Sequence, residues 1–147
     1  MNLFGVMEVS ASALGAERMR AELVTSNLAN AESTKTPEGG PYRRREVVFS
    51  SRKPSFPLSL AAAGSARTDQ IGTGVQARAV ENRSAPPVMR YEPSHPDANA
   101  DGYVAYPNIN PAAEMADLMG AARAYEMNIS ALTAAKQMIQ QSIEILK

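Results

Sequence analysis

The placement of proline divides this chain into three parts. All ten prolines lie between Pro37 and Pro111, and the segments on either side contain none. Proline removes a backbone donor and clashes with the preceding helical turn, so long helices are possible only at the two ends. The middle also holds six of the nine glycines. The pattern predicts an α+β fold in which two long terminal helices flank a small β-rich insert.

The segment 111–147 carries the clearest helical pattern. Asn110 can act as its N-cap, and Pro111 suits the first helical position. Apolar residues then recur at alternating spacings of three and four, which is a heptad pattern typical of helices that pack on other helices. This seam consists of Met115, Leu118, Ala122, Tyr125, Ile129, Leu132, Ile139, Ile143 and Leu146, with Lys136 as an interruption. A second apolar row beside it, including Met119, Met127 and Met138, makes the face too wide for one partner.

Residues 1–31 carry a weaker version of the same pattern, which predicts a helix over about residues 4–30. Its stripe includes Leu14, Val24 and Leu28. The two helices are predicted to pair as a coiled-coil-like hairpin. A pair of helices cannot bury so many large apolar side chains between them. Burying each such side chain contributes about 1.5–3 kcal/mol of stabilisation. We therefore expect self-assembly. A closed monomer, in which the insert covers the remaining apolar face, is the alternative.

The insert, residues 32–110, has short segments of strand composition. These are residues 43–49, 74–80, 88–91 and 103–106, and the second alternates with period two. The segment near 50–70 has loop composition, so we expect it to be flexible unless a partner orders it.

Charge and cysteine content exclude several classes of protein. Lysine plus arginine and aspartate plus glutamate are both 15, so the formal net charge is zero and no global basic field attracts nucleic acid. The absence of cysteine excludes disulfides and thiolate metal sites. The N-terminus lacks a basic leader and a long apolar run, so no cleaved signal peptide is expected. No apolar run is long enough for a transmembrane helix.

Catalytic motifs are absent. The one histidine, His95, has Asp97 and Asp101 nearby, which raises the possibility of a hydrolase or metal site. A solvated loop between two prolines is the better interpretation, because no second histidine is present. We expect no catalytic residue, no metal site and no cofactor. Arg43, Arg44 and Arg45 form a short basic run without aromatic platforms, which favours a surface contact with an acidic neighbour over nucleic-acid binding.

Several segments are similar to a known family. Residues 25–34 (TSNLANAEST), with Asn27 and Asn30 three apart, resemble the N-terminal signature of the flagellar axial proteins, the rod and hook family. Residues 41–49, 102–109 and 123–128, together with the pair Glu114-Met115, resemble segments of the short basal-body rod proteins. The similarity covers both helices and about a third of the insert, and it does not extend to 50–70.

This resemblance implies a structural subunit of the proximal rod, part of the drive shaft that transmits torque through helix packing. It implies that helices 1–31 and 111–147 form an inner layer and that the insert faces outward. Asn27, Asn30 and the apolar residues named above are the expected assembly interface. Expected partners are copies of the chain, other proximal rod proteins, the first distal rod protein and the adaptor between inner-membrane ring and rod.

The resemblance further implies export through the flagellar type III apparatus, without a cleaved signal. It also implies a periplasm-spanning location in the basal body. Neither nucleic acid nor direct membrane insertion is expected. Two alternatives remain: another rod protein such as FlgB, and a soluble helical adaptor or chaperone.

Overall fold

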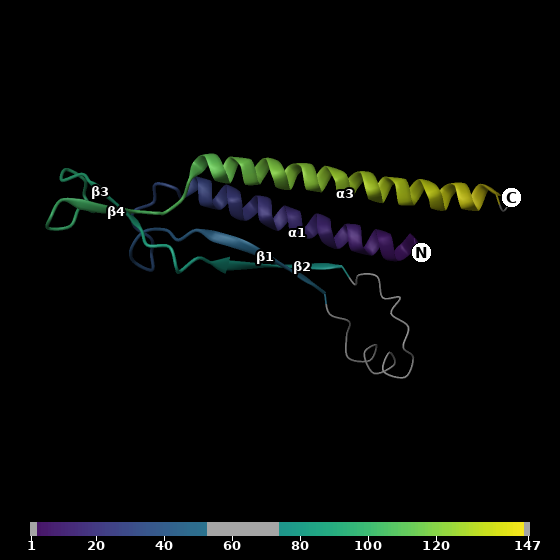
Figure 1. The fold of residues 1–147 in the computed structure, drawn as a ribbon, viewed down its shortest axis with the longest axis horizontal. Helices are drawn as coiled ribbons and strands as arrows, with labels where there is room; N and C mark the ends of the chain where they lie inside the picture. Colours follow the sequence, from purple (N-terminus) through teal and green to yellow (C-terminus); the bar gives the residue numbers. More distant parts are fainter. Residues whose placement is uncertain (1–2, 53–73, 146–147) are drawn as a thin grey trace, which may run out of the picture. The chain divides into compact units, whose positions relative to one another are not determined.

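The computed structural model describes residues 3–52 and 74–145. Its elements follow the order α1 (Leu3–Ala29), β1 (Arg45–Ser51), β2 (Val75–Glu81), β3 (Val88–Tyr91), β4 (Tyr103–Tyr106) and α3 (Pro111–Ile145) (Figure 1). The strands form two two-stranded sheets, β1 with β2 and β3 with β4. The α+β prediction of two long helices around a small β insert is therefore confirmed.

The strand predictions hold closely. The segments 88–91 and 103–106 are strands with exactly those bounds, while the first two strands begin one or two residues later than expected. The loop expected near 50–70 lies outside the described residues, apart from its first residues, which complete β1 and follow it.

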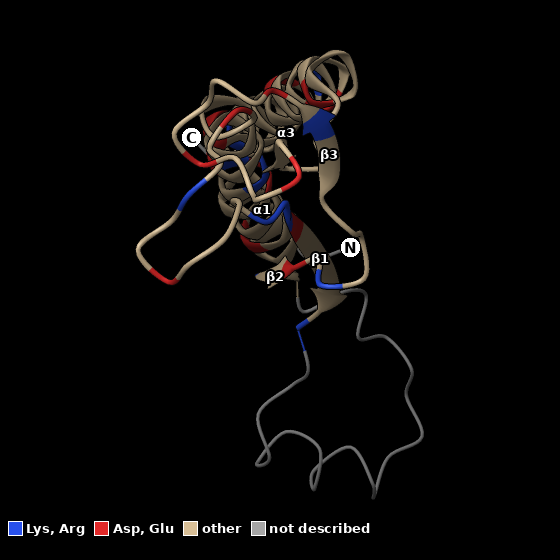
Figure 2. Ribbon diagram, turned by 90° about the vertical axis from the view of Figure 1, so that its left-hand side faces the viewer, with Lys and Arg blue, Asp and Glu red and all other residues tan. Residues whose placement is uncertain are grey.

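Two compact units make up the chain. The first contains Met1–Arg18, Phe49–Arg78 and Ala122–Lys147, and the second contains Met19–Val48 and Ala79–Ala121. Both helices and both strands of the first sheet contribute residues to each unit. Acidic and basic residues occur on the helices and on the strands alike (Figure 2).

In the first unit, β2 begins directly against α1. Ser12 Oγ donates to the carbonyl of Val9 at 2.7 Å and accepts the backbone N–H of Val75 at 2.9 Å. The preceding residue, Gly74, is buried and has φ +95°, and an added Cβ would lie 2.5 Å from Ser12 Oγ. Only glycine fits this approach of strand to helix without strain.

In the second unit, β3 and β4 form an antiparallel hairpin that pairs Val88 with Tyr106 and Tyr91 with Tyr103. Successive side chains of a strand point to opposite faces. On β4 this alternation buries Val104 and Tyr106 and leaves Tyr103 exposed, stacked edge-on with Tyr91 at a centroid distance of 5.3 Å. Only β4 thus has a buried face, since all four residues of β3 are exposed, and the other face of the hairpin carries the exposed aromatic pair.

The start of α3 follows the predicted capping. Asn110 Oδ1 accepts the backbone N–H groups of Ala112 and Ala113 at 3.0 and 3.4 Å, and Pro111 is the first helical residue. These bonds satisfy two of the donors that a helix leaves unpaired at its N-terminus.

The covered face of α3 agrees with the predicted seam at three positions and lies one residue earlier at several others, including Tyr125, which is exposed while Ala124 is half-buried. Leu118, Leu132 and Ile139 are half-buried, as a seam requires. Between them the covered positions are not Met115, Ala122, Ile129 and the interrupting Lys136 but the residues one before. These residues, Glu114, Ala121, Asn128 and Ala135, recur every seven residues, and all except half-buried Asn128 are fully buried. Small and polar side chains therefore face inward.

The large apolar side chains of α3 remain in contact with solvent. Met115 is 53% exposed, Met119 57%, Ile129 43% and Ile143 56%. Within the described residues, the insert therefore leaves these side chains uncovered. No helix among residues 3–52 and 74–145 is long and apolar enough to cross a bilayer.

Candidate functional site

The second unit is held together by a buried polar network centred on Asn27. Its side chain has no exposed surface, and its amide uses both of its ends. Nδ2 donates to the carbonyl of Arg45 at 2.8 Å and to Glu114 Oε2 at 3.0 Å. Oδ1 accepts the backbone N–H of Arg45 at 2.9 Å and the hydroxyl of Tyr42 at 3.2 Å. One side chain thereby joins the end of α1, the start of β1 and the first turn of α3.

Glu114 supplies the charge in this network. Only 1% of the residue is exposed, and its Oε1 accepts a hydrogen bond from Arg44 Nε at 2.6 Å. Arg44 also contacts Glu46 and lies 3.7 Å from Asp117. Burial alone disfavours the charged guanidinium, but the hydrogen bond and charge of Glu114, with those of Glu46, raise the pKa of Arg44 above its ordinary value. Arg44 is therefore a permanent cation, and it compensates the buried carboxylate.

Peripheral contacts extend the network. Arg20 Nη2 on α1 lies 3.1 Å from Asp117 Oδ1 on α3, in an ion pair that is partly exposed on both sides. Asn82 Nδ2, just after β2, donates to Glu46 Oε1 at 3.1 Å. Such partly exposed pairs contribute little individually, so the buried core of the network carries most of its energy.

The second asparagine of the signature ends the helix. Asn30 Nδ2 donates to the carbonyl of Ser26 at 2.9 Å, and Asn30 Oδ1 accepts the hydroxyl of Ser33 at 3.2 Å. The side chain therefore satisfies one of the last carbonyls of α1 and fixes the chain that leaves it. The two asparagines have different tasks: Asn27 connects elements, and Asn30 shapes the turn.

The structure distributes the predicted interface residues over three environments. Val24 and Asn27 are buried. The half-buried positions are Leu14, Leu28, Asn30, Leu118, Leu132 and Ile139. The exposed positions are Met115, Ala122, Tyr125, Ile129 and Ile143, while Leu146 lies outside the described residues. The prediction that these side chains contact other subunits stays a prediction. The exposed side chains are the ones that a neighbouring subunit could contact directly.

The loop around His95 is built as a turn. His95 Nδ1 accepts the backbone N–H of Asp97 at 3.1 Å, and the Asp97 carboxylate accepts the hydroxyl of Thr34 at 2.7 Å. Asp101 donates its backbone N–H to Asn99 Oδ1 at 3.0 Å. Within the described segments, no group of three or more histidine, cysteine, aspartate or glutamate side chains is placed to hold a metal ion.

Known proteins with related sequences identify the family. Residues 100–145 match the family model described as flagellar basal body rod FlgEFG protein C-terminal. The flagellar basal-body rod protein FlgC of Bacillus subtilis is 39% identical, and the alignment covers all of both chains. FlgC of Borreliella burgdorferi is 34% identical over all of this chain and 99% of its own. FlgC of Salmonella typhimurium is 37% identical over 99% of this chain and 98% of its own.

This chain belongs to the FlgC family. It is accordingly a structural subunit of the flagellar basal-body rod, as the resemblance implied. The FlgC names of these relatives favour this family over both alternatives, the sister rod protein FlgB and a soluble adaptor.

Two residues of this FlgC-family network had no strong signal in the sequence. Glu114 stands in the first turn of a helix, where an exposed acidic residue is ordinary. Arg44 belongs to a basic run for which the sequence favours a contact with an acidic neighbour, and the half-buried Arg44 makes such contacts within the chain, with Glu114 and Glu46. Arg43 and Arg45 are exposed, as predicted. The sequence signal for the position of Arg44 is the alternation of side chains along an extended segment, which places Arg44 on the side opposite to Arg43 and Arg45.

Proposed function

We propose that this rod subunit belongs to the proximal rod and transmits torque by helix packing, without enzymatic activity. In this proposal the helical ends, residues 1–31 and 111–147, form the inner layer of the rod, and the insert 32–110 faces outward. The observation that carries the proposal is the composition of the two faces of α3. Ala121 and Ala135 are buried, whereas its methionines and most of its isoleucines are exposed.

The exposed row supplies the driving force for assembly. Met115, Met119, Ile129 and Ile143 each keep about half of their surface in water. Burying such a side chain against a neighbouring subunit stabilises the contact by up to about 1.5–3 kcal/mol. Methionine adapts to partners of different shape, which suits a subunit that meets copies of itself and other rod proteins.

The proposal includes partners and a route. The partners are further copies, the other proximal rod proteins, the first distal rod protein and the adaptor to the inner-membrane ring. The chain reaches a periplasm-spanning basal body through the flagellar type III export apparatus, without losing a signal peptide.

The test is to replace Ile129 with aspartate and to purify basal bodies. Ile129 is 43% exposed, so the variant should fold with unchanged helicity by circular dichroism. We expect its loss from basal bodies and loss of swimming in soft agar, because a charge would be buried without a partner. Gln137→Asp adds the same charge at an exposed polar position and should assemble. A motile Ile129→Asp strain with normal basal bodies would refute the proposed role of this face.

A further inference from the structure

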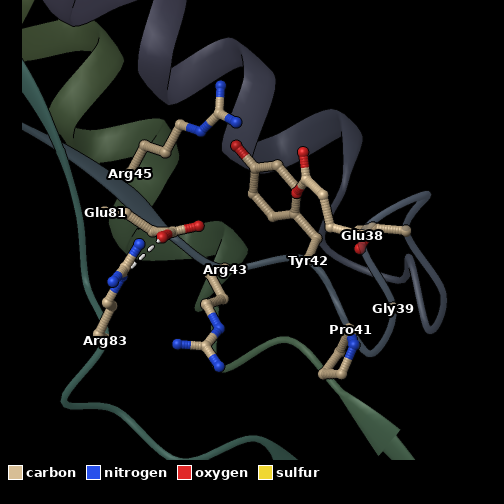
Figure 3. A pocket seen from close by; sticks show the side chains of 9 residues that line it. Glu38, Gly39, Pro41, Tyr42, Arg43, Arg45, Glu81 and Arg83 are labelled. Atoms are coloured by element: carbon tan, nitrogen blue, oxygen red, sulfur yellow. Dashed lines mark hydrogen bonds and ion pairs between the residues drawn. The ribbon is translucent and has the colours of Figure 1, made fainter.

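The insert side of the second unit contains an arginine-lined pocket that the proposed function does not use. The cavity measures about 430 Å³ and opens between the 36–41 turn, the start of β1 and the end of β2. Arginine and glutamate side chains gather around it (Figure 3). These are Arg43, Arg45, Arg83, Glu38 and Glu81, and the ring of Tyr42 forms part of the wall.

The pocket is positive because of the alternation in the basic run. Arg44 is drawn to the opposite side by Glu114, which leaves Arg43 and Arg45 together at the pocket. Glu81 is already engaged with Arg83, at 3.0 Å. In the described part of the chain, no carboxylate lies within ion-pair distance of Arg43 or Arg45. Counting Glu38, which also lines the pocket, the wall keeps a surplus of one positive charge, and the Arg43 and Arg45 guanidinium groups are available to an incoming anion.

The buried network also holds this pocket in shape. Asn27 binds both backbone groups of Arg45, and it accepts the hydroxyl of Tyr42. The Arg45 guanidinium lies 5.9 Å from the centre of the Tyr42 ring, within cation–π distance. Fixing the backbone and the ring lowers the entropy lost when a ligand binds.

We propose that this pocket receives carboxylate side chains from an acidic segment of an adjoining rod subunit, an inference that rests on the proposed function. Guanidinium groups match carboxylates in planar, two-bond geometry. The chain has no net charge, so a local positive surplus is balanced by acidic residues elsewhere. Asp97 and Asp101, both exposed in the insert, are carboxylates that a neighbouring copy could present.

The solution test titrates the full chain with an oligoglutamate peptide and follows the arginine side-chain signals by NMR. We expect shifts at Arg43 and Arg45, and binding at least about tenfold weaker in R43Q/R45Q, since charged hydrogen bonds are lost. Arg78→Gln, an exposed arginine of β2 outside the pocket, is the matched control and should bind normally. Equal affinity of R43Q/R45Q and the unaltered chain would overturn the proposal. Binding of inorganic phosphate but not of the peptide would also overturn it, because it would indicate a small-anion site.

The test in cells replaces the same two arginines with glutamate. Both side chains are exposed, so folding should be preserved, which circular dichroism verifies. We expect R43E/R45E to reduce swimming and recovery in basal bodies, while Arg78→Glu retains both. Normal assembly of R43E/R45E, beside failure of Ile129→Asp, would remove the acidic partner and leave the proposed function intact. Normal assembly of both R43E/R45E and Ile129→Asp would overturn the acidic partner and the proposed function together.

Discussion

The side-chain amide of Asn27 donates to Glu114 across 3.0 Å, and both side chains are sealed from solvent. The two residues stand 87 positions apart, one in the family signature and one at the start of the last helix. Their contact explains physically why an asparagine in that signature is useful. An amide can donate to a carboxylate while it also satisfies a backbone donor and acceptor, and no apolar residue can do this.

Replacing Asn27 with alanine should lower the free energy of unfolding by about 3 kcal/mol, because buried groups on three elements lose their partners. Urea unfolding followed by circular dichroism measures this change. The control is Asn128→Ala, which removes a single bond from the Asn128 amide to the carbonyl of Ala124. We expect this control substitution to lower the free energy of unfolding by less than about 1 kcal/mol. Equal effects of the two substitutions would contradict the role assigned to Asn27.

Arg44 and Glu114 should behave as a coupled pair in a double-mutant cycle. Arg44→Met alone leaves a buried carboxylate without its cation, which costs about 3–5 kcal/mol. Adding Glu114→Gln removes that charge and keeps an acceptor for Asn27, so the double variant should be more stable than the sum of the single effects predicts. The expected coupling is about 1–3 kcal/mol. Additive effects would mean that the two side chains do not act together.

Gly74→Ala should destabilise the chain by about 1–3 kcal/mol, since alanine disfavours a positive φ and its Cβ would collide with Ser12 Oγ. Gly120→Ala is the matched control. Nothing lies within 4 Å of a Cβ built there, inside α3. Alanine in a helix interior is favoured over glycine by about 0.5–1 kcal/mol, so this variant should be more stable. Thermal unfolding of both variants, measured side by side, should give shifts of opposite sign.

Tyr106 should be among the last of the five tyrosines to ionise. Its hydroxyl donates to Glu92 at 2.9 Å, and this hydrogen bond, with burial and the charge of Glu92, raises the pKa of Tyr106. A raised pKa means that the folded state holds the proton more tightly than the unfolded state. The associated stability is therefore present below the ordinary tyrosine pKa of about 10 and is lost as the pH rises through the folded pKa.

The measurement is a titration of phenolate absorbance in the near ultraviolet, with Tyr106→Phe to assign the late step. Glu92→Gln keeps an acceptor but removes the charge, so it should move this step to lower pH. An unchanged late step in Tyr106→Phe would assign it to another tyrosine.

Local features of the sequence predicted most of the fold because they depend on neighbouring residues. The proline distribution, the cap at Asn110 and the alternation in 74–80 all lead directly to elements that the structure contains. The face of α3 was harder to predict. Hydrophobicity alone selects Met115 and Ile129, but close packing of helices favours small side chains at the contact, and here Ala121 and Ala135 are the buried ones.

The buried network could not be predicted from local pattern. Its members come from three segments, and a charged residue is expected on the surface unless its partner is known. Nothing in the spacing of Arg44 and Glu114, 70 residues apart, indicates that they meet. The asparagine signature pointed to the correct place through family resemblance, but its physical role required the structure.

The inward alanines and outward methionines of α3 have a consequence for mutational scanning. Truncating Met115, Met119 or Ile143 removes few intramolecular contacts, so such variants should melt like the unaltered chain. Changes at Ala121, Ala135 or Asn27 alter packing within the chain and should be visible in any melting experiment. A thermal-shift screen and a swimming screen of the same library would therefore select nearly complementary sets of positions. The residues that the first screen reports as silent are those at which the second should be most informative.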